Sequence, residues 1–171
     1  MKRRLSVAQI RCSTPVGELT LTASSTALTG VYFPTSRHGP PPPPPVGESV
    51  SASPILARTR RQLEEYFAGS RTTFDLPLEA VGSPFEQRVW DELRRIPFGT
   101  TVSYGDLARR VGDPAASRAV GLANARNPIP IIVPCHRVIG ARGDLTGYGG
   151  GLDRKLWLLE HEGCYLPLAG R

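Results

Sequence analysis

The stretch "PCHRVIG", residues 134–140, places a cysteine and a histidine side by side behind a proline. A thiol next to an imidazole suits three kinds of site: a nucleophile with its general base, half of a metal site, or an inert buried thiol beside an unrelated ring. A free cysteine has a pKa of about 8.5, so a reactive Cys135 needs neighbours that favour the thiolate. The polar residues that follow, His136 and Arg137, favour a working thiol.

The remaining cysteines and histidines do not predict a metal site. Cys12, His38, His161 and Cys164 have no CxxC-type spacing, whereas structural zinc sites are built from close pairs of ligands. Three cysteines at such spacing also argue against a disulfide framework. A reducing, cytoplasmic compartment is therefore expected.

The residues around Cys135 predict how its side chain is presented. The apolar run 131–133 lies between prolines and predicts an extended β segment, because Pro134 keeps the residue before it extended. Adjacent side chains on an extended chain point to opposite sides. We therefore expect a water, rather than a direct contact, to link His136 to the sulfur. A helix predicted over 153–162 ends near Glu162, which would complete a Cys-His-acid relay if it faces His136.

The first third of the chain predicts a small antiparallel sheet. Residues 5–10, 17–23 and 27–33 are rich in β-forming residues and are separated by turn residues. Six consecutive prolines lie within 34–53, and proline lacks the N–H that a sheet or a helix needs. This segment is expected to be an exposed loop. A helix is then predicted from Ser53 to about residue 68, followed by a connector with a short strand over 74–78.

The second half predicts several short helices with strong start and stop signals. Two capping boxes mark helix starts, Ser83 with Glu86 and Ser103 with Asp106, and these helices are expected to end before Pro97 and at Gly112. Asp113 is expected to open a further helix at once, running through Ala125. Two short helices joined by a tight turn are typical of a helix-turn-helix.

The helix predicted over 114–125 consists almost entirely of small residues, and only Arg118 and Arg126, the latter just past its end, reach out far. A helix that reads the major groove usually carries several long polar side chains. This one suits either tight packing inside the protein or a close approach to a duplex. In the second case we expect contacts with phosphates or the minor groove, with Arg118 as the probe.

Composition and charge indicate a globular protein. The chain has 171 residues, of which 40% are hydrophobic and 21% are charged, with a net charge of +6. No apolar run approaches the roughly 20 residues of a membrane span, and the basic start lacks the apolar stretch of a signal peptide, so no membrane partner is expected. Of 21 basic residues only Lys2 and Lys155 are lysines. This arginine excess fits a compositional bias or a phosphate-binding surface.

Four motifs occur in order between roughly 83 and 163: "SYGDLA", "SRAVGLANARNPIPIIVPCHRVIG", "GYGGG" and "LLEHEG". Together they resemble the O6-alkylguanine-DNA alkyltransferases, while the preceding residues resemble that family only in outline. The resemblance implies an α+β or α/β fold. A small antiparallel β-sheet domain with a helix, ribonuclease H-like, would span 1–79 and include the proline-rich loop 34–53. A mainly helical domain with the helix-turn-helix and the reactive cysteine would span 80–171.

The resemblance also implies an activity. The chain would repair double-stranded DNA by irreversible, single-turnover transfer of the alkyl group from O6-alkylguanine, and from O4-alkylthymine, to its own cysteine. The damaged base would be flipped out of a duplex bound through its minor groove. A thioether offers water no good leaving group, so the protein would be consumed. No cofactor and no metal are implied, and the protein would act as a monomer.

Roles for particular residues follow from the same resemblance. Cys135 would accept the alkyl group, His136 would take the thiol proton through water, and Glu162 would hold His136. Asn127 would brace the active-site turn, and Tyr148 would donate a proton to the departing guanine.

The substrate pocket and the DNA surface can be assigned in the same way. The backbone N–H of Gly149 would lie near O6, and the carbonyls of Cys135 and Val138 would accept from the exocyclic amine. Arg118 would fill the gap left by the flipped nucleotide, and Tyr104 would promote flipping. In full, the implied pocket residues are Pro130, Val138, Gly149 and Gly150, and the implied DNA-binding residues are Arg118, Tyr104, Gly105, Asp113 and Ala119.

Some features depart from the family pattern and leave alternatives open. Many relatives have a serine at the position of Gly149, and Asp113 places a negative charge at a turn that would face phosphates. The six prolines have no family counterpart. The alternatives are an alkyltransferase-like damage sensor, a helix-turn-helix regulator and a Cys-His hydrolase. Sensors of that kind lack the reactive cysteine that this chain has, and no hydrolase pocket is evident.

Overall fold

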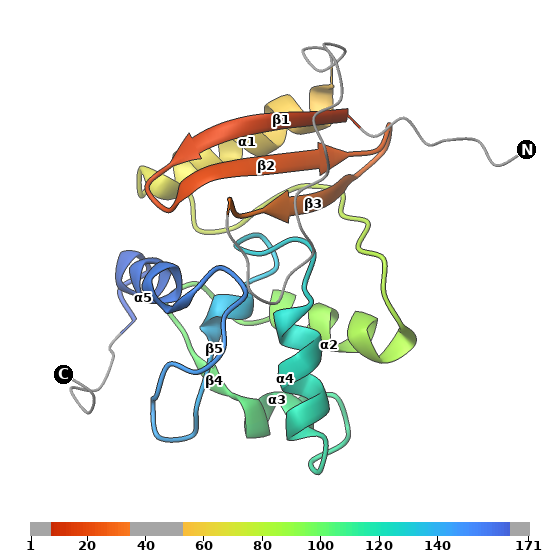
Figure 1. Cartoon of the computed structure of the whole chain (residues 1–171), viewed down its shortest axis with the longest axis vertical. Helices are drawn as coiled ribbons and strands as arrows, with labels where there is room; N and C mark the ends of the chain where they lie inside the picture. The colour runs from red at the N-terminus through yellow and green to blue at the C-terminus, as the bar shows by residue number, and fades with distance from the viewer. Residues whose placement is uncertain (1–7, 35–52, 165–171) are drawn as a thin grey trace, which may run out of the picture.

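The computed structural model describes residues 8–34 and 53–164, and its N-terminal part is a three-stranded antiparallel sheet. Strands β1 (Ala8–Thr14), β2 (Gly17–Ala23) and β3 (Leu28–Tyr32) are neighbours in chain order and form the predicted antiparallel sheet (Figure 1). Strand β1 runs four residues past the strand predicted over 5–10, whose first three residues lie outside the described ones. The predicted proline-rich loop lies, apart from its first and last residues, outside the described residues.

Helix α1 (Pro54–Phe67) packs along one face of this sheet and confirms the predicted helix after Ser53. The Ser53 hydroxyl accepts a hydrogen bond from the N–H of Leu56, and proline occupies the first turn, where its missing N–H costs nothing. Leu56, Leu63 and Tyr66 are buried toward the sheet and the core. The connector that follows forms only an isolated bridge between Leu28 and Leu78, so the predicted strand over 74–78 is wrong.

Helices α2 (Pro84–Arg94) and α3 (Tyr104–Arg110) begin at the predicted capping boxes. In each box the serine hydroxyl accepts from a backbone N–H while the acidic residue accepts from the serine N–H. Gly112, at φ +87, follows the end of α3 as expected. These local signals fix the helix starts because they satisfy backbone groups without any distant partner.

Helix α4 (Ser117–Ala125) begins later than the sequence analysis predicts. The carboxylate of Asp113 accepts from the N–H of Ala115, and its carbonyl accepts from the N–H of Ala116. Asp113 therefore stabilises a separate turn before the helix instead of capping it. The buried side chains of α4 are Val120, Ala123 and Asn124, so tight packing accounts for part of its run of small residues.

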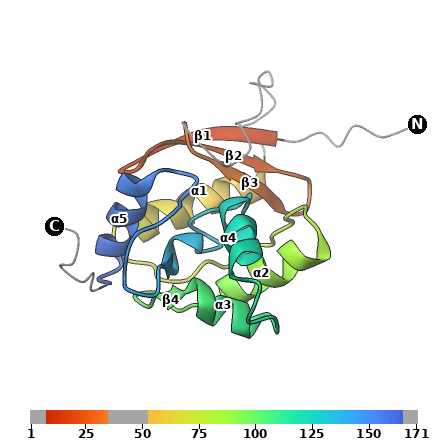
Figure 2. The same ribbon diagram turned by 60° about the horizontal axis from the view of Figure 1, so that its bottom comes forward.

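Helix α5 (Leu152–His161) ends where expected, with Glu162 as its C-cap and Gly163 at φ +73. Strand β4 (Val102–Ser103) pairs in parallel with β5 (Val138–Ile139). Strand β5 follows directly after the turn that contains Cys135. Figures 1 and 2 show the sheet and α1 at one end of the molecule, α2 to α4 at the other, and α5 beside them. Within the described ranges, no helix is long and apolar enough to cross a membrane.

Candidate alkyl-acceptor site

Cys135 begins a single 3-10 turn, Cys135–Arg137, that runs directly into β5. The prediction of an extended chain at this cysteine is wrong. Pro134 has ψ 66, and the N–H of Arg137 donates to its carbonyl, so the chain curls here. The expectation that the side chains of Cys135 and His136 point to opposite sides assumed an extended chain. It does not apply here, because the side chains of a 3-10 turn are spaced around its axis. Cys135 and His136 are both buried.

The loop before Cys135 is a folded turn, so the predicted β segment over 131–133 is also wrong. Ile131 has φ +73, a left-handed conformation that a β-branched residue adopts only when its surroundings hold it. Asn127 supplies part of that hold. Its amide donates to the carbonyl of Val133 at 2.8 Å, and its carbonyl accepts from the N–H of Ile129 at 3.0 Å. This geometry is what the predicted bracing role of Asn127 requires.

His136 faces Glu162, as the relay requires. Nε2 of His136 lies 2.7 Å from Oε2 of Glu162, and both side chains are fully buried. The other ring nitrogen, Nδ1, is buried and has no hydrogen-bond partner among the described residues. The carboxylate can only accept, so Nε2 carries the proton and Nδ1 is left as the basic nitrogen.

Glu162 has two further partners that the sequence analysis missed. Arg137 forms a fork on the carboxylate, with Nε 2.7 Å from Oε1 and Nη2 3.0 Å from Oε2. The hydroxyl of Tyr66, on α1, donates to Oε2 at 2.7 Å. The sequence analysis noted Arg137 as a polar residue close to the cysteine. No local pattern, however, connects Tyr66 with Glu162, which lies 96 positions further along the chain.

Burial and hydrogen bonding set the protonation of these groups. Burial raises the pKa of Glu162, but hydrogen bonds and charges from His136 and Arg137 outweigh it and hold the pKa well below its usual value. Burial lowers the pKa of His136, although Glu162 opposes the shift. Burial raises the pKa of the Cys135 thiol to about 11, although Asn127, Lys155 and Tyr148 act in the opposite direction. The resting site therefore holds a neutral thiol, a neutral imidazole and a carboxylate.

Lys155 is a second group that the sequence analysis missed. It is fully buried on α5, and its ammonium donates to the carbonyl of Val138 at 2.6 Å and to that of Thr146 at 3.1 Å. Burial lowers its pKa to about 8, while Cys135 opposes that shift. The sequence offered one signal: Lys155 is one of only two lysines in an arginine-rich chain.

A small cavity of about 30 Å³ opens beside the thiol. Predicted pocket residues Pro130, Gly149 and Gly150 line it together with Cys135, Asn127 and Tyr148. The other lining residues are Val31 and Tyr32 of β3, Phe33 directly after it, and Asn124 and Ala125 of α4. Val138 is the exception: it is fully buried and does not line the cavity. The phenol of Tyr148 is buried without a hydrogen-bond partner among the described residues, and its ring packs edge-on against Phe33. The cavity therefore offers an unused hydroxyl next to the sulfur.

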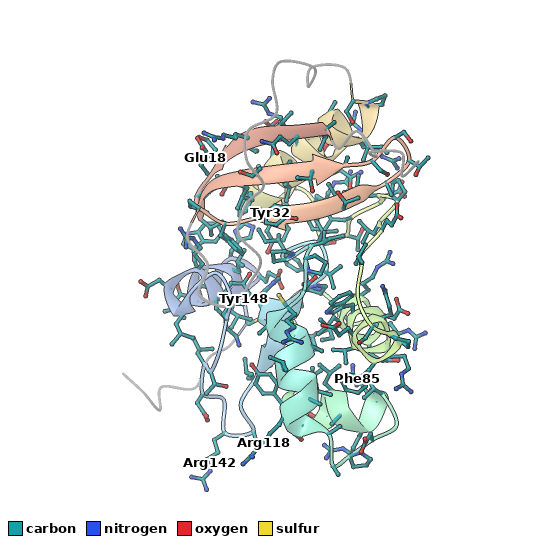
Figure 3. The ribbon with its side chains drawn as sticks, turned by 45° about the vertical axis from the view of Figure 1, so that its right-hand side comes forward. Glu18, Tyr32, Phe85, Arg118, Arg142 and Tyr148 are labelled. Carbon is teal, nitrogen blue, oxygen red and sulfur yellow. The ribbon has the colours of Figure 1, made fainter. Side chains whose placement is uncertain are left out.

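None of the predicted DNA-binding residues lines this cavity. Arg118, Ala119 and Asp113 are exposed, and Figure 3 shows Arg118 on α4 at the same end of the molecule as Arg142. Gly105 lies in the first turn of α3. Tyr104 is half-buried between the surface and the site, and its hydroxyl donates to the carbonyl of Thr146 at 2.8 Å. Helix α4 thus runs from an arginine-bearing surface to the cavity wall.

Comparisons with known proteins show which family this chain resembles. Residues 84–164 match the family model described as the 6-O-methylguanine DNA methyltransferase DNA binding domain, and residues 10–80 match the ribonuclease-like domain of the same family. The Mycobacterium leprae methylated-DNA–protein-cysteine methyltransferase is 50% identical over 148 residues, covering 86% of this chain and 87% of its own. A Bacillus subtilis constitutive enzyme of the same name is 45% identical over 150 residues, covering 87% and 91%.

A solved structure shows the same fold. The Mycobacterium tuberculosis OGT in complex with DNA is 46% identical, with a TM-score of 0.79 and coverage of 91% of both chains. The two family domains that this chain matches, ribonuclease-like and then DNA-binding, agree with the predicted fold of a small antiparallel sheet with a helix followed by a mainly helical part. The chain therefore belongs to the 6-O-methylguanine DNA methyltransferase family.

Proposed function

We propose that this chain repairs DNA by transferring the alkyl group from the O6 atom of guanine, and from O4 of thymine, to the sulfur of Cys135. The observation that carries the proposal is the relay itself: a buried thiol at a cavity wall, followed by a neutral imidazole that a buried carboxylate orients. The relatives named methylated-DNA–protein-cysteine methyltransferases support the same chemistry.

The reaction starts with proton removal. As the substrate enters, the Cys135 proton passes to Nδ1 of His136, directly or through a water. Glu162 accepts from Nε2 and stabilises the imidazolium that forms, and Arg137 keeps Glu162 ionised. The order of events suits the resting state, because a neutral thiol avoids a buried, unpaired negative charge until a substrate is present.

The sulfur then attacks the alkyl carbon, a carbon–sulfur bond forms and the carbon–oxygen bond to O6 breaks. Guanine leaves with the bonding electron pair on its oxygen, and the buried hydroxyl of Tyr148 can donate to it. The product is a thioether, which water does not cleave. Each copy therefore reacts once, and the chain's own side chains supply every proton transfer.

DNA is the macromolecular partner in this proposal. A guanine inside a duplex cannot present O6 to a buried sulfur, so the base must leave the stack, at a cost of a few kcal/mol. The exposed Arg118 can occupy, from the minor groove, the gap that the flipped base leaves in the duplex. In this proposal the DNA backbone lies near Tyr104 and Gly105 on α3 and near Ala119 and Asp113. The complex of the Mycobacterium tuberculosis relative with DNA supports this partner.

Organisation and compartment follow as further parts of the proposal. We propose that the protein acts as a monomer, because one copy carries both the relay and α4. We also propose that it has an N-terminal domain over 1–79 and a C-terminal domain over 80–171. The matched ranges 10–80 and 84–164 support that division. Three free cysteines favour the reducing cytoplasm.

A stoichiometry experiment tests the function. Duplex DNA with radiolabelled O6-methylguanine is supplied in excess, and the label on the protein is followed over time. We expect a plateau at one methyl group per chain and no labelling of Cys135→Ser. Continued turnover beyond one equivalent, or labelling of the serine variant, would rule out Cys135 as the final acceptor.

A further inference from the structure

The cavity beside Cys135 contains a buried acceptor that no step above uses. Asn124 on α4 lines the cavity and is 2% exposed. Its amide nitrogen donates to the carbonyl of Cys135 at 3.3 Å. Its oxygen, Oδ1, is buried without a hydrogen-bond partner among the described residues. An unpaired buried carbonyl oxygen is costly, so its retention beside a ligand cavity requires an explanation.

The orientation of this amide follows from its partner. The Cys135 carbonyl can only accept, so it selects the NH₂ end of Asn124. The opposite orientation would place two acceptor oxygens against each other and leave the donor end without that bond. Oδ1 is therefore the end of the side chain that remains free to receive a donor.

The backbone carbonyls expected to read the guanine amine already have donors. The Cys135 carbonyl accepts from the N–H of Val138 and from Asn124, which together occupy its two lone pairs. The carbonyl of Val138 accepts from the ammonium of Lys155 at 2.6 Å. Asn124 Oδ1 is thus an acceptor at the cavity that still has both lone pairs unused.

We propose that Asn124 is a specificity-determining residue that accepts a hydrogen bond from the 2-amino group of the extruded guanine. The inference rests on the proposed function. An O6-alkylated guanine has lost its N1 proton, so the 2-amino group is the one N–H donor that its ring edge offers. An O4-alkylated thymine offers no N–H donor at all. Asn124 would therefore favour guanine over thymine, because only guanine satisfies the buried oxygen.

Removing the 2-amino group from the substrate tests the contact. Single-turnover transfer rates are measured for duplexes that carry O6-methylguanine or O6-methylhypoxanthine, which differ only in that group. The ratio of the two rates is compared between the wild type and Asn124→Leu, which has a similar volume without polar atoms. Differences in base extrusion belong to the DNA and cancel when the two ratios are compared.

We expect the wild type to prefer O6-methylguanine, and Asn124→Leu to reduce that preference by on the order of tenfold, the value of one good hydrogen bond. The gap between O6-methylguanine and O4-methylthymine should narrow in the same variant. Gln62→Leu is the matched control, since Gln62 lies on α1 and its buried amide pairs with the backbone of Asp75, in the connector after that helix. It should leave the ratio unchanged.

An equal loss of rate on both substrates would overturn the inference, because it would mean that Asn124 acts only by holding the Cys135 carbonyl. Asn124→Ala provides the same comparison if the leucine variant fails to fold, as judged by its circular dichroism spectrum. Failure of the proposed function is distinguishable, since the wild type would then transfer nothing from O6-methylguanine.

Discussion

Tyr66 and Glu162 are 96 positions apart in the chain, yet the phenol of Tyr66 donates a 2.7 Å hydrogen bond to the carboxylate that orients His136. Tyr66 is fully buried on α1, which packs on the N-terminal sheet. Its ring also packs edge-on against Phe98 and His161. The N-terminal part of the chain therefore reaches directly into the relay that serves Cys135.

Removing only this hydroxyl should weaken both the fold and the reaction. Tyr66→Phe keeps the ring contacts but leaves Oε2 of Glu162 with one donor fewer, and a buried hydrogen bond to a charged group contributes about 1.5–3 kcal/mol. We expect urea unfolding to show a loss of this size, and single-turnover transfer to slow several-fold.

Thr59→Val is the matched control for that change. Thr59 is a fully buried residue of the same helix, and its hydroxyl donates to the carbonyl of Ile55, away from the relay. Thr59→Val should alter stability without altering the rate of transfer or its dependence on pH. If Tyr66→Phe also had the rate and pH dependence of the wild type, the phenol would have no part in the relay.

The depressed pKa of Glu162 predicts how stability changes with acid. Its unfolded-state pKa is about 4.3, and the folded value is lower because His136 and Arg137 favour the carboxylate. The stabilisation is thus fully present above the unfolded value and is lost as pH falls through the folded value. We expect the free energy of unfolding of the wild type to fall steadily below about pH 5.

Glu162→Gln isolates this contribution. The variant should be less stable by about 3–5 kcal/mol at neutral pH, because it leaves the guanidinium of Arg137 buried without its counter-charge. Its stability should then vary less between pH 5 and 3 than that of the wild type, as measured by urea unfolding at each pH. Parallel curves for the two proteins would mean that another carboxylate governs the acid transition.

Arg118 should matter for duplex DNA and not for the chemical step. It is exposed on α4 and does not line the cavity, so Arg118→Ala removes the group proposed to fill the gap left by the flipped base. We expect transfer from duplex O6-methylguanine to slow at least tenfold, since unstacking costs a few kcal/mol. Transfer from free O6-benzylguanine should change little.

A charge-matched control separates this role from a general loss of positive charge. Arg61→Ala removes an exposed arginine from α1, on the other part of the chain, where it pairs with Glu65. Its effect on duplex transfer should be small. Equal slowing of duplex and free-base transfer in Arg118→Ala would instead identify Arg118 as a structural residue.

The sequence predicted those parts of the fold that local interactions determine. Both capping boxes are present because a serine and an acidic residue three positions later satisfy backbone groups of the same turn. Asp113 shows the limit of such signals. Its carboxylate can cap a helix or close a turn, and the structure takes the turn, so α4 begins at Ser117.

The turn at Cys135 could not be predicted from propensity. The apolar residues 131–133 and their flanking prolines favour extended structure, but the amide of Asn127 holds a folded loop in which Ile131 has φ +73. Hydrogen bonds between a side chain and the backbone of the same loop thus override the backbone preference of the individual residues. The partners Tyr66 and Lys155 were missed for a different reason, since only the fold brings them to the site.

The most direct measurement of the central claim is the mass of the Cys135 peptide after reaction. The protein is incubated with duplex DNA that carries one O6-methylguanine, digested, and analysed by mass spectrometry alongside a sample treated with unmodified DNA. We predict a gain of one methyl group on the peptide that contains Cys135, with the Cys12 and Cys164 peptides unchanged. An unmodified Cys135 peptide from protein that still binds the duplex would contradict the account.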